Sequence, residues 1–147
     1  MKLIDTDETV VLVTGTSLTA EERDRPTAYA LKAEIDRRGV GHAYRRAVVV
    51  GDVWYLDNRI FHLNPTIAIG GPGANGVASE FADGLPTVLS LDDRVFIQAD
   101  FEGEIKRASL WGADSRATAA AVEAFVGRGM LDELLGKIWK FRVGTFV

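Results

Sequence analysis

The centre of the chain reads Thr66-Ile67-Ala68-Ile69-Gly70-Gly71-Pro72-Gly73-Ala74-Asn75-Gly76. A short apolar run that stops at glycine and proline is typical of a strand buried on both faces of a sheet. The residues from Gly76 to about Ala82 then predict a short helix, with Asn75 in the capping position. A strand, a glycine-rich turn and a helix in this order predict one unit of a sheet that is covered by helices.

A comparable unit lies at the start of the chain. Val10 to Val13 is an apolar, β-branched run that ends at Thr14-Gly15, so it predicts a second buried strand. We expect the following helix to be capped by Asp24, with Pro26 in its first turn, and to end at Gly39.

A third strand is predicted between these two units. Ala47 to Val50 repeats the buried pattern and ends at Gly51-Asp52. Val53 to Leu56 is interpreted as an extension or bent continuation of this strand, and Asp57-Asn58 as a turn.

The C-terminal half changes character, because closely spaced strands occur there without intervening helices. Such spacing, with polar turn residues between the strands, predicts antiparallel pairing. The predicted elements are strands at Thr87–Leu91, Val95–Ala99 and Ile105–Trp111, helices from Asp114-Ser115 to Gly127 and from Met130 to Trp139, and a tail at Phe141–Val147 that forms an edge strand or pairs with a partner chain.

These elements predict one α/β domain over residues 1–147. Its sheet is mixed and largely parallel, with an antiparallel C-terminal portion and helices on both faces, as in Rossmann-like and flavodoxin-like three-layer folds. The carboxyl ends of the parallel strands, with their glycines, then share one edge of the sheet. Ligands bind at this edge in open α/β sheets.

The composition of the chain disfavours several classes of binding partner. The 147 residues carry a formal net charge of −4, which disfavours nucleic acid, and they include no cysteine. The first eight residues are acidic and lack a signal-peptide core, and no apolar run approaches the roughly 20 residues that span a bilayer. We therefore expect a cytoplasmic protein without a membrane partner.

The turn after the central strand matches the phosphate-binding pattern G-x-G-x-x-G through Gly71, Gly73 and Gly76. These glycines and Asn75, which lies within the pattern, are candidate ligand contacts. Backbone amides at such a turn can bind phosphate with help from the helix dipole. Asp92 or Asp93 follows at the distance expected of a ribose-binding acid. The alternative is a strand exit at which Asn75 only caps a helix.

A second loop offers similar chemistry. Gly15, Thr16 and Ser17 follow the first strand, and their amides and hydroxyls could hold a phosphate; the loop resembles the phosphate loop of flavodoxin-like proteins. The alternative is a capped loop beside the sheet. Asp52 ends a buried strand at the same edge, so we expect it to supply a polar contact to the ligand.

Two short segments resemble a pattern found in cell-wall-binding repeats and archaeal surface-layer domains. They are Ile67-Ala68-Ile69-Gly70-Gly71 and Trp111-Gly112-Ala113-Asp114-Ser115-Arg116-Ala117-Thr118, with one copy of each in this chain. In that family the first segment is a strand and the second a strand-to-helix turn. In this chain, Asp114 or Ser115 is expected to cap the helix that runs to Gly127.

The sequence identifies no catalytic group and no metal site, because His42 and His62 lack partners at ligand spacing. The first functional hypothesis is therefore the binding of a small anionic or nucleotide-like molecule at the two glycine turns, with no cofactor identified. The alternative is a non-enzymatic structural or interaction module that forms a homo-oligomer. A flavodoxin-like flavin protein is a third possibility.

Overall fold

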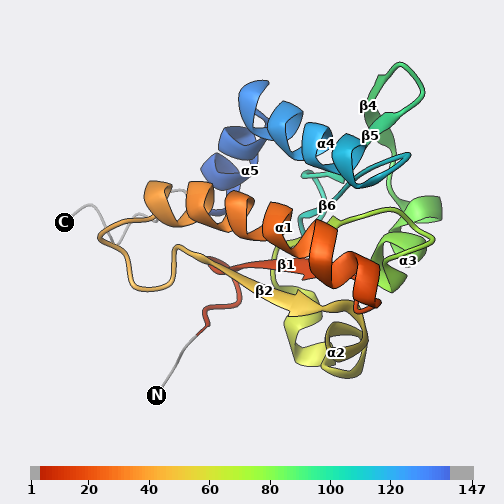
Figure 1. The fold of residues 1–147 in the computed structure, drawn as a ribbon. Coiled ribbons are helices and arrows are strands. Elements are labelled where there is room, and N and C mark those ends of the chain that lie inside the picture. The colour runs from red at the N-terminus through yellow and green to blue at the C-terminus, as the bar shows by residue number, and fades with distance from the viewer. Residues whose placement is uncertain (1–3, 140–147) are drawn as a thin grey trace.

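The computed structural model describes residues 4–139, and the strands of this part form one sheet (Figure 1). The strands are β1 (Val10–Thr14), β2 (Ala47–Gly51), β3 (Thr66–Ile69), β4 (Thr87–Leu91), β5 (Val95–Asp100) and β6 (Arg107–Gly112). The helices are α1 (Leu18–Arg38), α2 (Asp52–Asp57), the 3-10 helix η1 (Arg59–Leu63), α3 (Gly76–Gly84), α4 (Ser115–Gly127) and α5 (Met130–Ile138). The tail at Phe141–Val147 lies outside the described residues.

The strand order is β2-β1-β3-β6-β5-β4. β2, β1, β3 and β6 run parallel to one another, whereas β5 is antiparallel to both β6 and β4. Asp92 and Asp93 turn the β4–β5 hairpin with φ angles of 52° and 53°, a left-handed conformation that Asp tolerates better than most residues. The predicted mixed sheet with an antiparallel C-terminal portion is confirmed.

Helices cover both faces of the sheet, as predicted. α1, α4 and α5 pack on one face around Val10 and Leu12, and α2, η1 and α3 lie on the other face around Val11 and Val13 (Figure 1). Successive β1 side chains therefore enter different apolar clusters, and all four are fully buried. This two-sided burial explains why the strand is an unbroken apolar run.

The predicted start of α1 is wrong. The helix begins at Leu18, because the Ser17 hydroxyl accepts a hydrogen bond from the Ala20 amide and caps the first turn. Pro26 therefore lies inside the helix, where it is exposed. Asp24 is not a cap: it occupies the buried side of α1, a position that becomes important for the site.

The predicted continuation of β2 through Val53–Leu56 is also wrong, because this segment is the helix α2. The helical turn directs Tyr55 into the core, where its hydroxyl lies 3.0 Å from the Thr66 hydroxyl. Val53 and Trp54 remain exposed. The apolar run is therefore divided between core and surface by a helix, and not between the two faces of a strand.

No helix within residues 4–139 is long and apolar enough to cross a membrane.

Candidate functional site

The two predicted glycine turns meet in space. β1 and β3 are adjacent and parallel, so the turns that follow them leave the same edge of the sheet, on the right in Figure 1. A Cβ atom added to Gly15 would lie 1.9 Å from the carbonyl oxygen of Ala74. The first turn therefore rests directly on the second, and only glycine permits this approach.

Asn75 fills the space between these turns. Its side-chain nitrogen donates hydrogen bonds to the carbonyl oxygens of Val13 and Ile69, at 2.9 and 3.0 Å. Its side-chain oxygen accepts from the amides of Val77 and Ala78, at 2.9 and 3.2 Å. The side chain thus joins β1 to β3 and caps α3, and it uses two of the amides that a phosphate would need.

Asp52 closes the remaining part of this gap. One carboxylate oxygen accepts hydrogen bonds from the Thr16 hydroxyl and the Val53 amide, and the other accepts from the Gly76 amide at 2.7 Å. Asp52 is 8% exposed. Its carboxylate already occupies the amide that we expected to bind an external anion.

The residues selected from the sequence are therefore brought to one edge, but most of their polar groups bond within the fold. Thr16 bonds to Asp52, Ser17 caps α1, and Asn75 and Asp52 satisfy the first turn of α3. Gly71 and Gly73 differ, because they line a hollow beside this cluster. Asp92 and Asp93 form the β4–β5 hairpin and take no part in either gap.

The hollow lies at the carboxyl ends of β3 and β6 and has a volume of about 360 Å³. After β3 the chain continues to α3 on one face of the sheet, and after β6 it continues to α4 on the other face. The two segments therefore diverge at this point, as they do at ligand sites of open α/β sheets. The hollow is lined by Asp24, Gly71, Pro72, Gly73, Ala74, Trp111, Gly112, Ala113, Asp114, Ser115 and Thr118.

Asp24 is the principal polar side chain of this hollow. It reaches the site from the buried side of α1, and it is 5% exposed. Burial raises the pKa of its carboxyl group, and a hydrogen bond with the Ser115 side chain opposes the rise. Its Oδ1 atom is buried and has no hydrogen-bond partner in the described part of the chain.

Gly70 makes room for this carboxyl group. A Cβ atom at position 70 would lie 2.9 Å from Oδ2 of Asp24, and Gly70 has a φ of 111°, which side-chain-bearing residues rarely adopt. The lack of a side chain at the end of β3 therefore leaves space for the Asp24 carboxyl group from α1.

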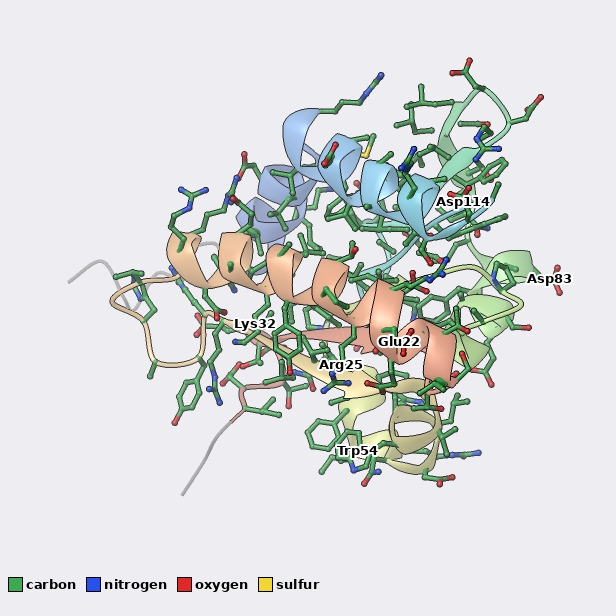
Figure 2. The ribbon with its side chains drawn as sticks, in the orientation of Figure 1. Glu22, Arg25, Lys32, Trp54, Asp83 and Asp114 are labelled. Atoms are coloured by element: carbon green, nitrogen blue, oxygen red, sulfur yellow. The ribbon has the colours of Figure 1, made fainter. Side chains whose placement is uncertain are left out.

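The start of α4 forms the opposite side. Asp114 caps the helix by accepting a hydrogen bond from the Ala117 amide at 2.8 Å, and its second oxygen lies 2.9 Å from the Arg94 guanidinium. The Ala117 amide, with Arg94, holds the pKa of the Asp114 carboxyl below its usual value. Figure 2 shows Asp114 at the N-terminal end of α4.

Several backbone amides around the hollow remain unbonded. Within residues 4–139, the amides of Gly71, Gly73, Ser115 and Arg116 have no hydrogen-bond partner. Ser115 and Arg116 are the first two residues of α4, where helix amides lack intrahelical acceptors. These donors, unlike those of α3, have no acceptor within the described part of the chain.

Trp111 provides an apolar wall. It is half-buried and stacks on Phe96 with ring centroids 4.5 Å apart. Its indole nitrogen donates to Gln98 at 3.1 Å, and Gln98 in turn donates to the carbonyl oxygens of Ala82 and Leu85. This network fixes the orientation of the ring beside Gly71.

The sequence interpretation missed Asp24 and Trp111 as residues of the site. A signal for Asp24 was present, because Ala20, Asp24 and Ala28 follow one another at four-residue spacing on the buried face of α1. Recognising it requires placing the helix start at Ser17. The predicted cap of α4 at Asp114 is confirmed.

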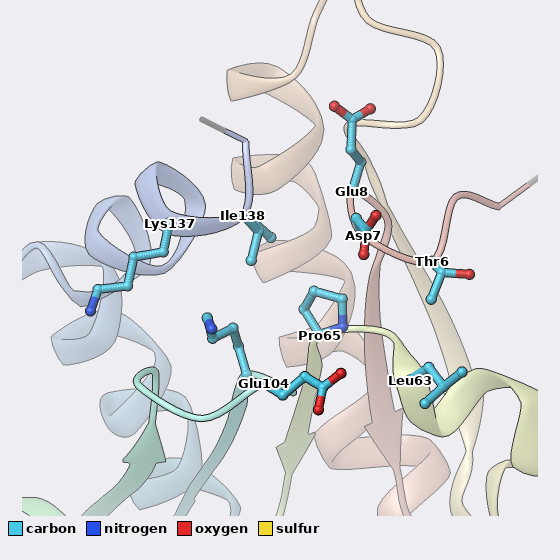
Figure 3. Close-up of a pocket in the computed structure, with 9 residues that line it drawn as sticks. Thr6, Asp7, Glu8, Leu63, Pro65, Glu104, Lys137 and Ile138 are labelled. Atoms are coloured by element: carbon cyan, nitrogen blue, oxygen red, sulfur yellow. The ribbon is translucent and has the colours of Figure 1, made fainter. Parts of the chain in front are cut away.

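A separate hollow of about 240 Å³ lies at the amino ends of the parallel strands, the opposite end of the sheet (Figure 3). Charged side chains around it pair within the fold: Glu8 binds Arg45, and Lys137 binds Glu102. Two of its lining charges, Glu8 and Lys137, are therefore compensated.

No cluster of three histidine or acidic side chains suited to a metal ion occurs in the described residues. His62 stacks on Tyr55, and its Nε2 lies 2.8 Å from the Tyr55 carbonyl oxygen.

No protein-family model matches the chain, and no curated protein matches its sequence. The resemblance to cell-wall-binding and surface-layer domains therefore remains a prediction.

Proposed function

We propose that this α/β domain binds a small anionic, nucleotide-like molecule in the hollow between the turns that follow β3 and β6. The observation that carries the proposal is the set of unbonded amides on both sides of this hollow, from Gly71 and Gly73 and from the start of α4. Such amides, together with the helix dipole, form a binding site for phosphate or carboxylate. This places the ligand one strand further along the sheet than the sequence predicts.

The electrostatics at the start of α4 support an anion. The lowered pKa of Asp114 shows that this helix end already stabilises one negative charge. Arg94 compensates that charge by pairing with the same carboxylate. An incoming anion therefore meets free amides and not an uncompensated acid at this end of the hollow.

The apolar wall supports a ligand with a flat or apolar portion. Trp111 is held rigidly by Phe96 and Gln98 and borders the hollow next to Gly71. Aromatic rings in such positions bind bases or sugar faces through their apolar surface. A nucleotide-like molecule offers both parts, a phosphate for the amides and a ring for Trp111.

Thermal-shift measurements with inorganic phosphate, ribose 5-phosphate and AMP test this proposal. A ligand at a hundred times its dissociation constant adds about 2.7 kcal/mol to the free energy of unfolding. Gly73 is exposed, and a Cβ atom there meets nothing within 4 Å, so Gly73→Glu places a negative charge at the hollow without steric conflict. We expect this variant to lose the shift.

Gly127→Glu is the matched control, because it adds the same charge at the far end of α4, where a Cβ atom also meets nothing within 4 Å. It should retain the shift. The proposal is wrong if no anion stabilises the wild type, or if Gly73→Glu and Gly127→Glu respond equally.

The alternative of a homo-oligomeric interaction module has one observation in its favour. α2 and η1 carry large apolar side chains on their surface: Val53, Trp54, Ile60 and Leu63 are 45–74% exposed. Exposed apolar patches mark contact sites between protein chains. Light scattering over a range of concentrations, with Trp54→Glu for comparison, tests whether two copies associate through this patch.

A further inference from the structure

We infer that the ligand of this hollow carries at least one hydroxyl group besides its anionic group, and that Asp24 recognises this hydroxyl. The ligand class is then a phosphorylated polyol, either a sugar phosphate or a nucleotide. This inference rests on the proposed function, because it assumes that the anionic group binds the amides of α4 and the glycine turn.

The unsatisfied carboxyl group of Asp24 is the first reason. A carboxylate can accept about four hydrogen bonds, whereas the structure gives Asp24 only the bond with Ser115. Buried polar groups are otherwise nearly always paired, so an unpaired one at the wall of a hollow indicates a missing donor. A ligand in the hollow can supply that donor.

The position of Asp24 on α1 is the second reason. It interrupts a stripe formed by Ala20, Ala28 and Leu31, all of which are at most 2% exposed. An alanine at position 24 would continue this apolar stripe without the desolvation that raises the pKa of the carboxyl. Perturbed, buried acids of this kind concentrate at functional sites.

The chemistry of the donor follows from the surroundings. The hollow contains one other carboxylate, Asp114, and its oxygens are used by Ala117 and Arg94. A metal ion would require more oxygen ligands than Asp24 alone provides. A neutral hydroxyl satisfies the carboxylate without adding charge, and the side-chain torsion of Asp is broad enough to turn either oxygen toward it.

The size of the hollow favours one small molecule that carries both groups. Asp24, Ser115 and Gly73 line the same 360 Å³ space, which lies at the lower end of the range for small-molecule sites. A five-carbon sugar phosphate has its hydroxyl groups a few bonds from its phosphate, so one small molecule carries both groups. Trp111 then faces the ring of the sugar or the attached base.

Isothermal titration calorimetry with methyl phosphate and ribose 5-phosphate separates the two claims. Both probes carry a phosphate ester, but only ribose 5-phosphate carries hydroxyl groups. We expect wild-type protein to bind ribose 5-phosphate at least about tenfold more tightly, the size of one hydrogen bond to a charged group. AMP distinguishes the two ligand classes. Tighter binding of AMP than of ribose 5-phosphate identifies the ligand as a nucleotide, and equal binding identifies it as a sugar phosphate. Both results support the inference.

Asp24→Asn tests the residue directly, because it keeps the shape of the side chain and removes its charge. We expect the preference for ribose 5-phosphate to fall below about threefold, while methyl phosphate binds at least as tightly as before. Asp83→Asn is the control: Asp83 is an exposed acid near the end of α3, and the preference should persist.

The outcomes are distinguishable. Equal binding of the two probes by the wild type, or an undiminished preference in Asp24→Asn, overturns the role of Asp24 and leaves the anion site standing. Failure of every probe to bind overturns the proposed function as well. If Asp24→Asn does not fold, the pH profile of the wild type decides: the preference must decline as Asp24 takes up a proton at acidic pH, and a flat profile overturns the inference.

Discussion

Replacing Asn75 tests whether this side chain holds the β1 and β3 turns together. Asn75→Ala removes the cap of α3, which costs about 1 kcal/mol. It also removes the donors to the Val13 and Ile69 carbonyl oxygens, at about 1 kcal/mol for each lost bond or more where the carbonyl stays dry. The free energy of unfolding should therefore fall by about 3 to 4 kcal/mol.

Asn75→Asp separates the two roles, because it keeps the capping oxygen and loses the donor nitrogen. At neutral pH its carboxylate would face two carbonyl oxygens, so the folded state favours the protonated form and raises the pKa of the new acid. A group that binds its proton more tightly when folded makes stability fall as pH rises through this range. Asn75→Asp should thus be most stable at acidic pH, relative to the wild type.

Urea titrations followed by tryptophan fluorescence and circular dichroism measure both effects. Asn58→Ala is the matched control, since the Asn58 side chain donates one exposed hydrogen bond to the Trp54 carbonyl oxygen, and it should cost less than about 1 kcal/mol. Equal, small losses for the Asn75 and Asn58 variants would refute the reasoning. The gap between β1 and β3 would then be loosely held and open to a ligand.

Two further predictions concern the same edge of the sheet. Burial raises the pKa of the Asp24 carboxyl, so the free energy of unfolding of the wild type should fall as pH rises from 3.8, the pKa in the unfolded chain, through the raised pKa of the folded state. Asp24→Asn should lack this fall. Urea titrations from about pH 3 to pH 8 compare the two proteins, and the same pH dependence of stability in both would contradict a buried acid. Gly15→Ala should lower the free energy of unfolding by about 1 to 3 kcal/mol or more, because the added Cβ atom would lie 1.9 Å from the Ala74 carbonyl oxygen. Gly84→Ala, with nothing within 4 Å of its Cβ atom, should change the melting temperature little, and a similar loss in both variants would argue against close contact of the turns.

The fold was largely predictable because strands of a helix-covered sheet are apolar runs, fully buried in β1 and β3 and half-buried in the edge strand β2. Val10–Thr14, Ala47–Gly51 and Thr66–Ile69 are apolar runs that end at glycine or a polar turn, and each is a strand. The closely spaced C-terminal strands likewise predicted the hairpin, since short turns permit only antiparallel pairing. Both errors, at Asp24 and at Val53–Leu56, concern segments whose local signals fit two structures.

The candidate site was only partly predictable. The sequence showed glycine turns that would share one edge, and it selected Gly71 and Gly73, which line the hollow. It predicted the cap at Asn75, but it could not show that Asp52 would occupy the Gly76 amide or that Asn75 would also bind the Val13 carbonyl oxygen. These hydrogen bonds join residues 24 and 62 positions apart, so they depend on the pairing of β1, β2 and β3, which no local pattern encodes.

The sequence by itself determined the alternation of strands and helices, because burial and turn conformation act on neighbouring residues. Tertiary structure alone decided which polar groups remain free. The packing of α1 places Asp24 beside Gly70 at the end of β3 and next to Ser115 at the start of α4. An acid far from β3 in the chain becomes part of the hollow because packing of α1 on the sheet fixes where its buried face points.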